Sequence, residues 1–186
     1  MRLKLLSTLR TVNLHRSYVH TLNMKKANKI TVTADPFYSE ITEIIDVRSP
    51  DEYKQDHIPN AVNLPVLNNV ERHQVGKLYS TNQFDARKVG AAIVVSNIQD
   101  ILEKHVLNKD KDYKPMVYCW RGGQRSKSLG TILSEIGFDV YILEGGYKTY
   151  RKKVREELAT LPGRFKYHVI SGLTGTGKSH ILSKLT

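Results

Sequence analysis

Short apolar runs alternate along the chain with segments in which apolar residues recur every three or four positions. The runs end in charged residues or glycine, which is typical of buried strands, whereas the three- and four-residue spacing predicts helices. Strands that alternate with helices predict an α/β fold, a parallel sheet flanked by helices on both sides. The expected strands cover residues 42–48, 115–119 and 138–143, and the expected helices cover residues 85–106, 124–136 and 147–158.

Local signals mark the ends of several elements. Ser49 and Pro50 fit the N-cap and the first position of a short helix after the first strand. Gly137 fits the position just beyond the end of a later helix. Asp46 and Arg48 are expected to pair near the end of the first strand, in a structural and not a catalytic role.

Cys119 is the only cysteine of the chain and stands at the end of an expected strand. Sites of parallel sheets form beyond the carboxyl ends of the strands, where this thiol falls. The glycines that follow let backbone N–H groups turn inward around an anion, and the next helix adds its positive dipole end. These surroundings favour a nucleophilic thiolate, and the alternative is a small buried structural residue. The loop residues are Trp120, Arg121, Gly122, Gly123, Gln124, Arg125 and Ser126.

The two arginines of this loop define the chemistry that it suits. Arg121 and Arg125 add fixed positive charge, and either guanidinium can hold an oxyanion through two hydrogen bonds. The loop therefore suits attack by Cys119 on a chalcogen or phosphorus centre that is carried by an anionic group.

A second motif near the end of the chain fits the phosphate-binding loop G-x-x-x-x-G-K-S. It follows an apparent strand at 167–170 and precedes a helical pattern at 180–185, which is the context that such a loop requires. Its glycines would let N–H groups cradle phosphates, Lys178 would reach the terminal phosphates, and Ser179 could ligate Mg²⁺. The phosphate-binding positions are Gly172, Gly175, Gly177, Lys178 and Ser179.

The sequence ends soon after this motif, at Thr186. The remaining residues are too few for the sheet, the metal-holding acid and the base-binding wall of a nucleotide site. We therefore expect a fragment of a longer two-domain protein, with a phosphate loop that is incompetent on its own. The expected divisions are a leader at 1–34, a first domain at 40–155 and an incomplete second domain at 165–186.

Positive charge is concentrated in the leader. Residues 1–34 hold seven of the 29 Lys and Arg and none of the 18 Asp and Glu, so the rest of the chain carries only +4 of the net +11. The leader resembles a transit peptide, mitochondrial more than secretory, with a cytoplasmic or plastid location as the alternative. Met24 is an alternative start. No apolar stretch approaches 18 residues, so no membrane helix is expected, and no structural zinc spacing is present.

Three segments resemble the rhodanese superfamily over residues 40–155: Ile45–Tyr53, His57–Ala61 and Leu143–Tyr147. The residues from Asn68 to Tyr79, the Cys119 loop, Glu144–Lys148 and the phosphate loop together are similar to the tRNA 2-selenouridine synthase family. The joining of a rhodanese domain to a phosphate loop is the most specific element of this resemblance.

The resemblance implies a two-step exchange on 2-thiouridine at the wobble position of tRNA. Geranyl diphosphate first alkylates the sulfur, and selenophosphate then replaces the geranylthio group with selenium. Cys119 would be the essential thiol, receiving selenium as a perselenide or assisting the displacement. Arg121, Arg125 and the loop N–H groups would hold the donor, and the phosphate loop would bind the diphosphate or a nucleotide, with Mg²⁺ as a further candidate. tRNA and a selenophosphate donor system are the implied partners, and the oligomeric state stays open.

Three other functions remain open. Simple sulfurtransferases of this fold resemble Cys-x4-Arg, whereas five residues separate Cys119 from Arg125 here. The longer spacing is also that of rhodanese-like dual-specificity phosphatases, in which a wider loop holds phosphate. A thiosulfate sulfurtransferase, such a phosphatase and an inactive truncated remnant are therefore the alternatives.

Overall fold

The computed structural model describes residues 30–185, and the chain divides into two compact units, Met1–Tyr150 and Arg151–Thr186. Almost all of the expected leader, together with its proposed targeting role, lies outside the described residues.

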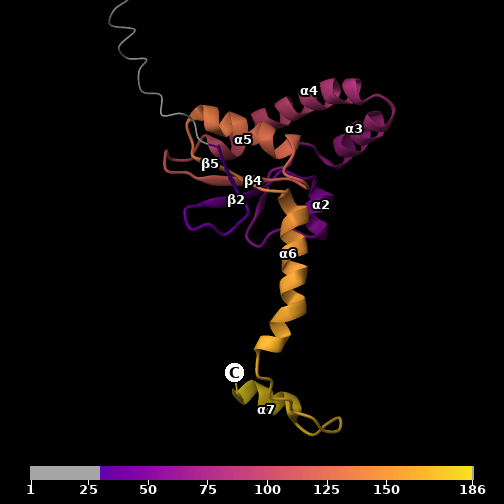
Figure 1. Ribbon diagram of the computed structural model, residues 1–186, viewed down its shortest axis with the longest axis vertical. Helices are drawn as coiled ribbons and strands as arrows, with labels where there is room; N and C mark the ends of the chain where they lie inside the picture. Colours follow the sequence, from indigo (N-terminus) through magenta and orange to yellow (C-terminus); the bar gives the residue numbers. More distant parts are fainter. Residues whose placement is uncertain (1–29, 186) are drawn as a thin grey trace, which may run out of the picture. The chain divides into compact units, whose positions relative to one another are not determined.

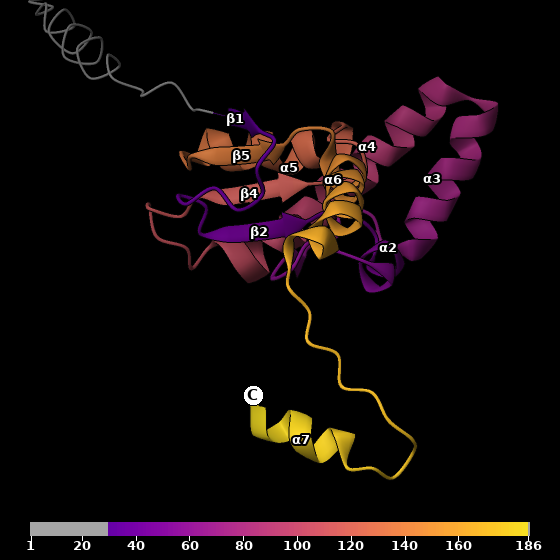
Figure 2. The ribbon, with the colours of Figure 1, turned by 60° about the horizontal axis from the view of Figure 1, so that its bottom comes forward.

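The first unit is built on a sheet of five parallel strands in the order β1-β5-β4-β2-β3. Figure 1 labels β2, β4 and β5 of this sheet, and Figure 2 shows β1, β5, β4 and β2 side by side. Each pair of neighbours runs in the same direction, so every connection must cross from one end of the sheet to the other. The expected parallel α/β sheet is therefore confirmed. The strands are β1 (Ile30–Thr33), β2 (Glu43–Asp46), β3 (Val62–Asn63), β4 (Pro115–Tyr118) and β5 (Val140–Leu143).

Helices connect these strands and cover both faces of the sheet. A π-helical turn, Leu102–Val106, continues α4, and a 3-10 turn, Leu161–Arg164, follows α6. The α-helices are α2 (Pro50–Gln55), α3 (Asn69–Thr81), α4 (Gln83–Ile101), α5 (Gln124–Ile136), α6 (Gly146–Thr160) and α7 (Lys178–Leu185).

The ends of these helices follow from local side-chain chemistry. Ser49 is the N-cap of α2, and its N–H donates to the Glu52 carboxylate at 3.1 Å. The side chain of Asn82 accepts hydrogen bonds from two backbone N–H groups in the first turn of α4. Gly137 ends α5 at a φ of +116°, in the left-handed region that glycine tolerates.

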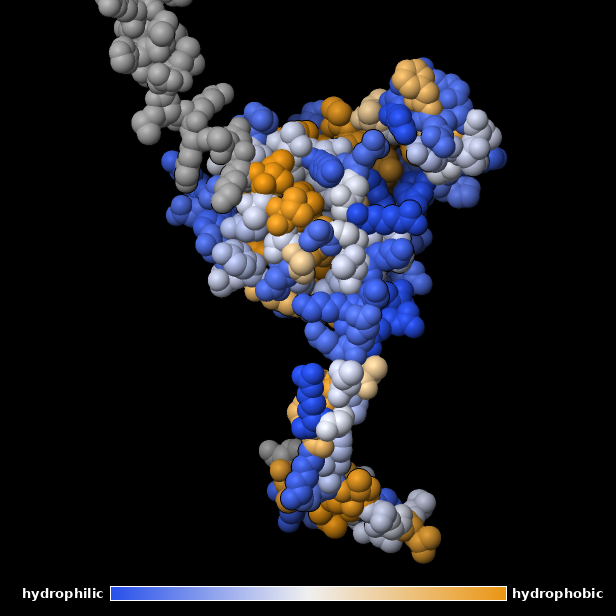
Figure 3. All heavy atoms as spheres, viewed as in Figure 1, coloured by the Kyte–Doolittle hydropathy of each residue, from blue (hydrophilic) through white to orange (hydrophobic). Residues whose placement is uncertain are grey.

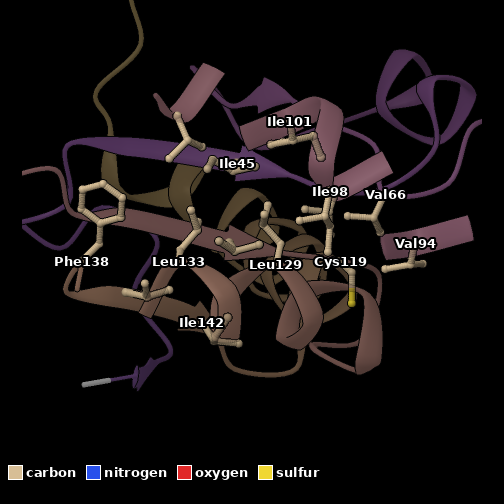
Figure 4. Packing of buried hydrophobic residues seen from close by; sticks show 14 of the residues in the cluster. Ile45, Val66, Val94, Ile98, Ile101, Cys119, Leu129, Leu133, Phe138 and Ile142 are labelled. Atoms are coloured by element: carbon tan, nitrogen blue, oxygen red, sulfur yellow. The ribbon is translucent and has the colours of Figure 1, made fainter. Parts of the chain in front are cut away.

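Two apolar clusters lie on opposite faces of the sheet. The first packs the buried faces of α4 and α5 against β2, β4 and β5, and Figure 4 shows ten labelled residues of it, with Cys119 among them. The second contains Ile58, Tyr118 and Tyr147 and packs the start of α6 against the other face. All four residues of β4 and of β5 are buried, as expected for central strands covered on both faces.

A buried ion pair lies at the C-terminal end of β2. Arg48, 1% exposed, donates from Nη2 to Oδ2 of Asp46 at 2.6 Å. Its guanidinium also lies 4.0 Å from the centre of the Tyr147 ring. The expected structural pairing is confirmed, and the pair contacts the first turn of α6.

Three sequence expectations differ from the structure of the first unit. Residues 30–33, assigned to the leader, form the edge strand β1. The expected helix at 85–106 begins at Gln83 and ends in the π-helical turn. Helix α3 was not predicted, because none of its residues is buried and its apolar positions lack a clear period.

The second unit contains the end of α6, the 3-10 turn and α7. Residues 165–177 between the turn and α7 form no strand, so the strand expected at 167–170 is wrong. A strand needs a neighbour for its backbone N–H and C=O groups, and the chain from 151 to 185 provides none. The side chain of Val169 is accordingly 85% exposed.

Candidate functional site

Cys119 follows the last residue of β4 and is a free thiol, 3% exposed, at the carboxyl edge of the sheet. The next four residues form a bend, and α5 begins at Gln124. Gly122 allows this bend because its φ is +65°, a conformation that side chains disfavour. The loop thus turns back over the sulfur directly before the N-terminus of a helix.

Two hydrogen-bonding groups face the sulfur. The N–H of Gly123 donates to Sγ at 3.2 Å, and Oγ of Ser126 lies 3.3 Å from Sγ. Ser126 also donates to the carbonyl of Gly123 at 3.1 Å. Its single proton can serve either acceptor, so Ser126 is able to donate to a thiolate. Gly123 and Ser126 are thus the two groups that can donate hydrogen bonds to the sulfur.

The loop rests on the first turn of α6. The N–H of Tyr147 donates to the carbonyl of Cys119 at 2.9 Å, and the N–H of Lys148 donates to the carbonyl of Trp120 at 3.0 Å. Gly146 makes this contact possible: a Cβ there would stand 2.5 Å from the nitrogen of Gly122 and closer still to the carbonyl oxygen of Cys119. In the sequence, Gly146 stood out only as a member of the segments that carry the family resemblance.

Arg125 makes a contact that the sequence did not predict. Its Nη1 donates to Oε2 of Glu52 at 2.7 Å, and Arg72 lies 3.9 Å from the same oxygen. Burial disfavours the charged form of Glu52, but the hydrogen bond and charge of Arg125 outweigh it and hold the pKa of Glu52 below its usual value of 4.5. The arginine expected to bind an anion therefore has a carboxylate as its partner in this structure.

The remaining loop residues point to different surroundings. The ring of Trp120 packs against the second apolar cluster, 5.8 Å from the ring of Tyr147. Arg121 and Gln124 are exposed. The structure thus brings Cys119, Gly123 and Ser126 together around the sulfur, and it leaves Arg121 as the exposed arginine of the loop.

A large apolar groove of about 970 Å³ lies beside the loop. It is lined by α3, α4 and the first half of α5, including Gln124 and Arg125. No pattern in the sequence predicted this groove, because it exists only where the unpredicted helix α3 meets α4 and α5.

The phosphate loop differs from the Cys119 loop in its environment. Lys178 donates from Nζ to the carbonyls of Gly172 and Leu173 at 2.8 and 2.6 Å, and α7 begins at this lysine. Ser179 is exposed. No group of three or more His, Cys, Asp or Glu side chains suited to a metal occurs within residues 30–185. The expected role of Ser179 as a ligand of Mg²⁺ stays a prediction.

No helix in the described part of the chain is long and apolar enough to cross a membrane.

Comparisons with known proteins identify the fold family. The model of the rhodanese-like domain matches residues 31–153. A tRNA 2-selenouridine synthase of Sulfurovum sp. is 38% identical over 146 residues, which cover 77% of this chain and 40% of that protein. Another from Nitrosomonas europaea is 35% identical over 151 residues, covering 78% of this chain and 38% of that protein. The chain thus spans about two fifths of the length of these relatives.

A solved structure agrees with this result. The N-terminal domain of a protein named as an ATP/GTP-binding protein, from Clostridium difficile 630, is 36% identical, with a TM-score of 0.59. The match covers 68% of this chain and 98% of that domain. Because the family model matches well over half of the sequence and its residues form the expected parallel sheet with a cysteine loop, this chain belongs to the family of rhodanese-like domains.

Proposed function

We propose that this chain carries the thiol-bearing domain of a tRNA 2-selenouridine synthase, which replaces sulfur by selenium in 2-thiouridine at the wobble position of tRNA. The observation that carries the proposal is the sulfur of Cys119, which accepts a hydrogen bond from Gly123 and faces Ser126 before the N-terminus of α5. The names of the relatives give the substrate class.

Selenophosphate is the proposed selenium donor, and geranyl diphosphate is the proposed second co-substrate. In the exchange, selenium bonds to C2 of the alkylated base, the bond from C2 to sulfur breaks, and geranylthiol leaves. The phosphate loop is proposed to hold a phosphate group in a longer form of the protein. No step is assigned to Mg²⁺.

Cys119 is proposed to free the selenium from its donor. Its thiolate attacks phosphorus, so that an S–P bond forms while the P–Se bond breaks and selenide leaves with the bonding pair. Water then hydrolyses the S–P bond and releases phosphate. A perselenide made by attack on selenium would require phosphorus to leave as phosphite, a two-electron reduction, so we favour attack on phosphorus. The wide loop of five residues before Arg125 suits a phosphoryl group.

Mass spectrometry of wobble uridines tests the function. In cells that lack the gene, the wild-type gene is expected to restore 2-selenouridine and the variant Cys119→Ser is not. Ser80→Ala is the control, because Ser80 is exposed on α3 and lies outside the Cys119 loop. Unchanged 2-selenouridine with Cys119→Ser would overturn the proposal.

A thiosulfate sulfurtransferase is the second candidate, because the chain has the rhodanese-like fold with a cysteine at the sheet edge. Formation of thiocyanate from thiosulfate and cyanide distinguishes the two. We expect this activity to be slow in comparison with reaction of Cys119 with selenophosphate.

Mitochondrial import is proposed for the leader, whose residues 1–34 contain no Asp or Glu. A reporter fused to these residues is expected to enter mitochondria. A reporter that spreads through the cytosol would remove this part of the proposal.

A further inference from the structure

The groove beside the Cys119 loop has two chemically different parts. Its walls come from the facing sides of α3, α4 and α5, and most of the side chains that line it are apolar. Helix α3 has no buried residue and packs against α4. Figure 3 shows the α3–α4 hairpin projecting at the upper right, with apolar atoms where it meets the rest of the unit. The principal apolar lining residues are Leu67, Val75, Val94, Val95, Ile98 and Ile132.

The polar residues of the groove are dominated by positive charge. Four cations line it, Arg72, Arg87, Arg125 and Lys127, and no Asp or Glu does. Glu52, the partner of Arg125, lies outside the lining and 3.9 Å from Arg72. The side chain of Arg72 is 47% exposed, and its contact with Glu52 is longer than a hydrogen bond. Arg72 remains available to a negatively charged group at the end of the groove that borders the loop.

We propose that this groove binds an anion with a hydrocarbon chain, with the chain between α3, α4 and α5 and the anionic head at Arg72 and Arg125. Apolar walls favour the chain, and the four cations of the lining, which outnumber the one carboxylate beside Arg72 and Arg125, favour the head. A volume of about 970 Å³ is at the upper end of the range of small-molecule sites.

The position of the head ties the groove to the thiol. Arg125 is the second residue of α5, and Cys119 precedes that helix by five residues. A head held there lies next to the loop that contains the reactive sulfur. If the proposed function holds, the occupant is geranyl diphosphate, and its prenyl chain lies in the rhodanese-like unit. The identity of this occupant rests on the proposed function. The binding of an anion with a hydrocarbon chain rests on the lining of the groove alone.

A series of n-alkyl phosphates tests the inference by calorimetric binding to the purified chain. Transfer of a methylene group from water to an apolar site stabilises by about 0.8 kcal/mol, so affinity is expected to rise about two- to fourfold per methylene from butyl to octyl phosphate. Inorganic phosphate is expected to bind far more weakly than octyl phosphate. An affinity that is flat along the series would overturn the proposal.

Two neighbouring alanines of α4 provide a matched pair of variants. Ala91 lines the groove, whereas Ala92 does not, and both are exposed. Ala91→Phe is expected to fill the groove and weaken octyl phosphate at least tenfold, while Ala92→Phe leaves its affinity within twofold. Equal effects of the two substitutions would place the ligand elsewhere and contradict the proposal.

The head is tested separately with Arg72→Gln. This variant is expected to weaken octyl phosphate about five- to tenfold and to leave binding of neutral 1-octanol unchanged. Equal losses for both ligands would contradict the assignment of the head. These measurements use neither Cys119 nor tRNA, so the groove can fail while selenium transfer holds, and the reverse.

Discussion

The chain contains two glycine-rich loops that each precede a helix, and their surroundings differ. The Cys119 loop lies at the carboxyl ends of the strands of a five-stranded sheet. The N–H of Gly123 donates to the sulfur of Cys119, a residue that is 3% exposed. The loop at 172–179 follows residues that form no strand, and Lys178 binds the carbonyls of its own loop. The two loops have similar sequences of glycines before a helix, but only the Cys119 loop is held in place by other elements among the described residues.

The support for the Cys119 loop can be traced through the first unit. Two backbone N–H groups at the start of α6 bind carbonyls of the loop, and the ring of Tyr147 lies over Arg48. Arg48 is in turn bound by Asp46 at the end of β2. Corresponding contacts do not occur among the described residues of the second unit, so we expect substitutions in the two loops to have different effects on stability.

The largest loss of stability is expected for Asp46→Asn. This change leaves the guanidinium of Arg48 buried without its charged partner, which costs about 3–5 kcal/mol in the free energy of unfolding. Denaturant unfolding at pH 7 measures the loss. A loss below about 1 kcal/mol would show that the pair does not support the first unit.

Gly146→Ala is expected to have the next largest effect, about 3 kcal/mol, because a Cβ collides with the loop and the φ of +61° is unfavourable for alanine. Denaturant unfolding again provides the measurement. Gly123→Ala, in the same loop, should change stability by less than about 1 kcal/mol. Equal losses would contradict the close packing of the loop on α6.

Glu52→Gln is expected to lower the stability by about 1 kcal/mol at pH 7, since it removes the charge that binds Arg125. The pKa of Glu52 is lowered in the folded protein, so the ionised carboxylate stabilises above its usual value of 4.5 and the contribution is lost as the pH falls through the lowered pKa. The wild type and the variant should therefore converge below pH 4.5. A constant difference down to pH 2, measured by urea unfolding, would oppose this account.

The smallest effect is expected in the second loop. Lys178→Ala should leave the free energy of unfolding within about 0.5 kcal/mol, because Lys178 contacts only its own exposed loop. Calorimetry should detect no binding of ATP at micromolar affinity by the wild-type chain. ATP binding that Lys178→Ala abolishes would show that the loop functions without a surrounding sheet.

The sequence was sufficient for elements whose signals are local. The buried strands β4 and β5 are continuous apolar runs. Serine followed by proline at positions 49 and 50 is typical of the start of a helix, and glycine at position 137 is typical of the end of one. The position of Cys119, directly after a buried strand and before a bend that leads into a helix, also followed from the sequence.

Features that depend on distant residues were not predictable in this way. Glu52 and Arg125 are 73 positions apart, so nothing in either segment signals their pairing. Strand β1 was assigned to the leader because it is an edge strand with exposed Ile30 and Val32 and lacks the fully apolar pattern of β4. The apparent strand at 167–170 has apolar residues but no neighbour to pair with.

The reaction of Cys119 with selenophosphate tests the central claim most directly. The purified chain is mixed with selenophosphate, quenched rapidly in acid and digested, and the peptide that contains Cys119 is weighed by mass spectrometry. We predict a phosphoryl adduct on Cys119 without the isotope pattern of selenium, which is absent from Cys119→Ser. An adduct that carries selenium, or a failure of the wild-type chain to release phosphate from selenophosphate, would contradict the account.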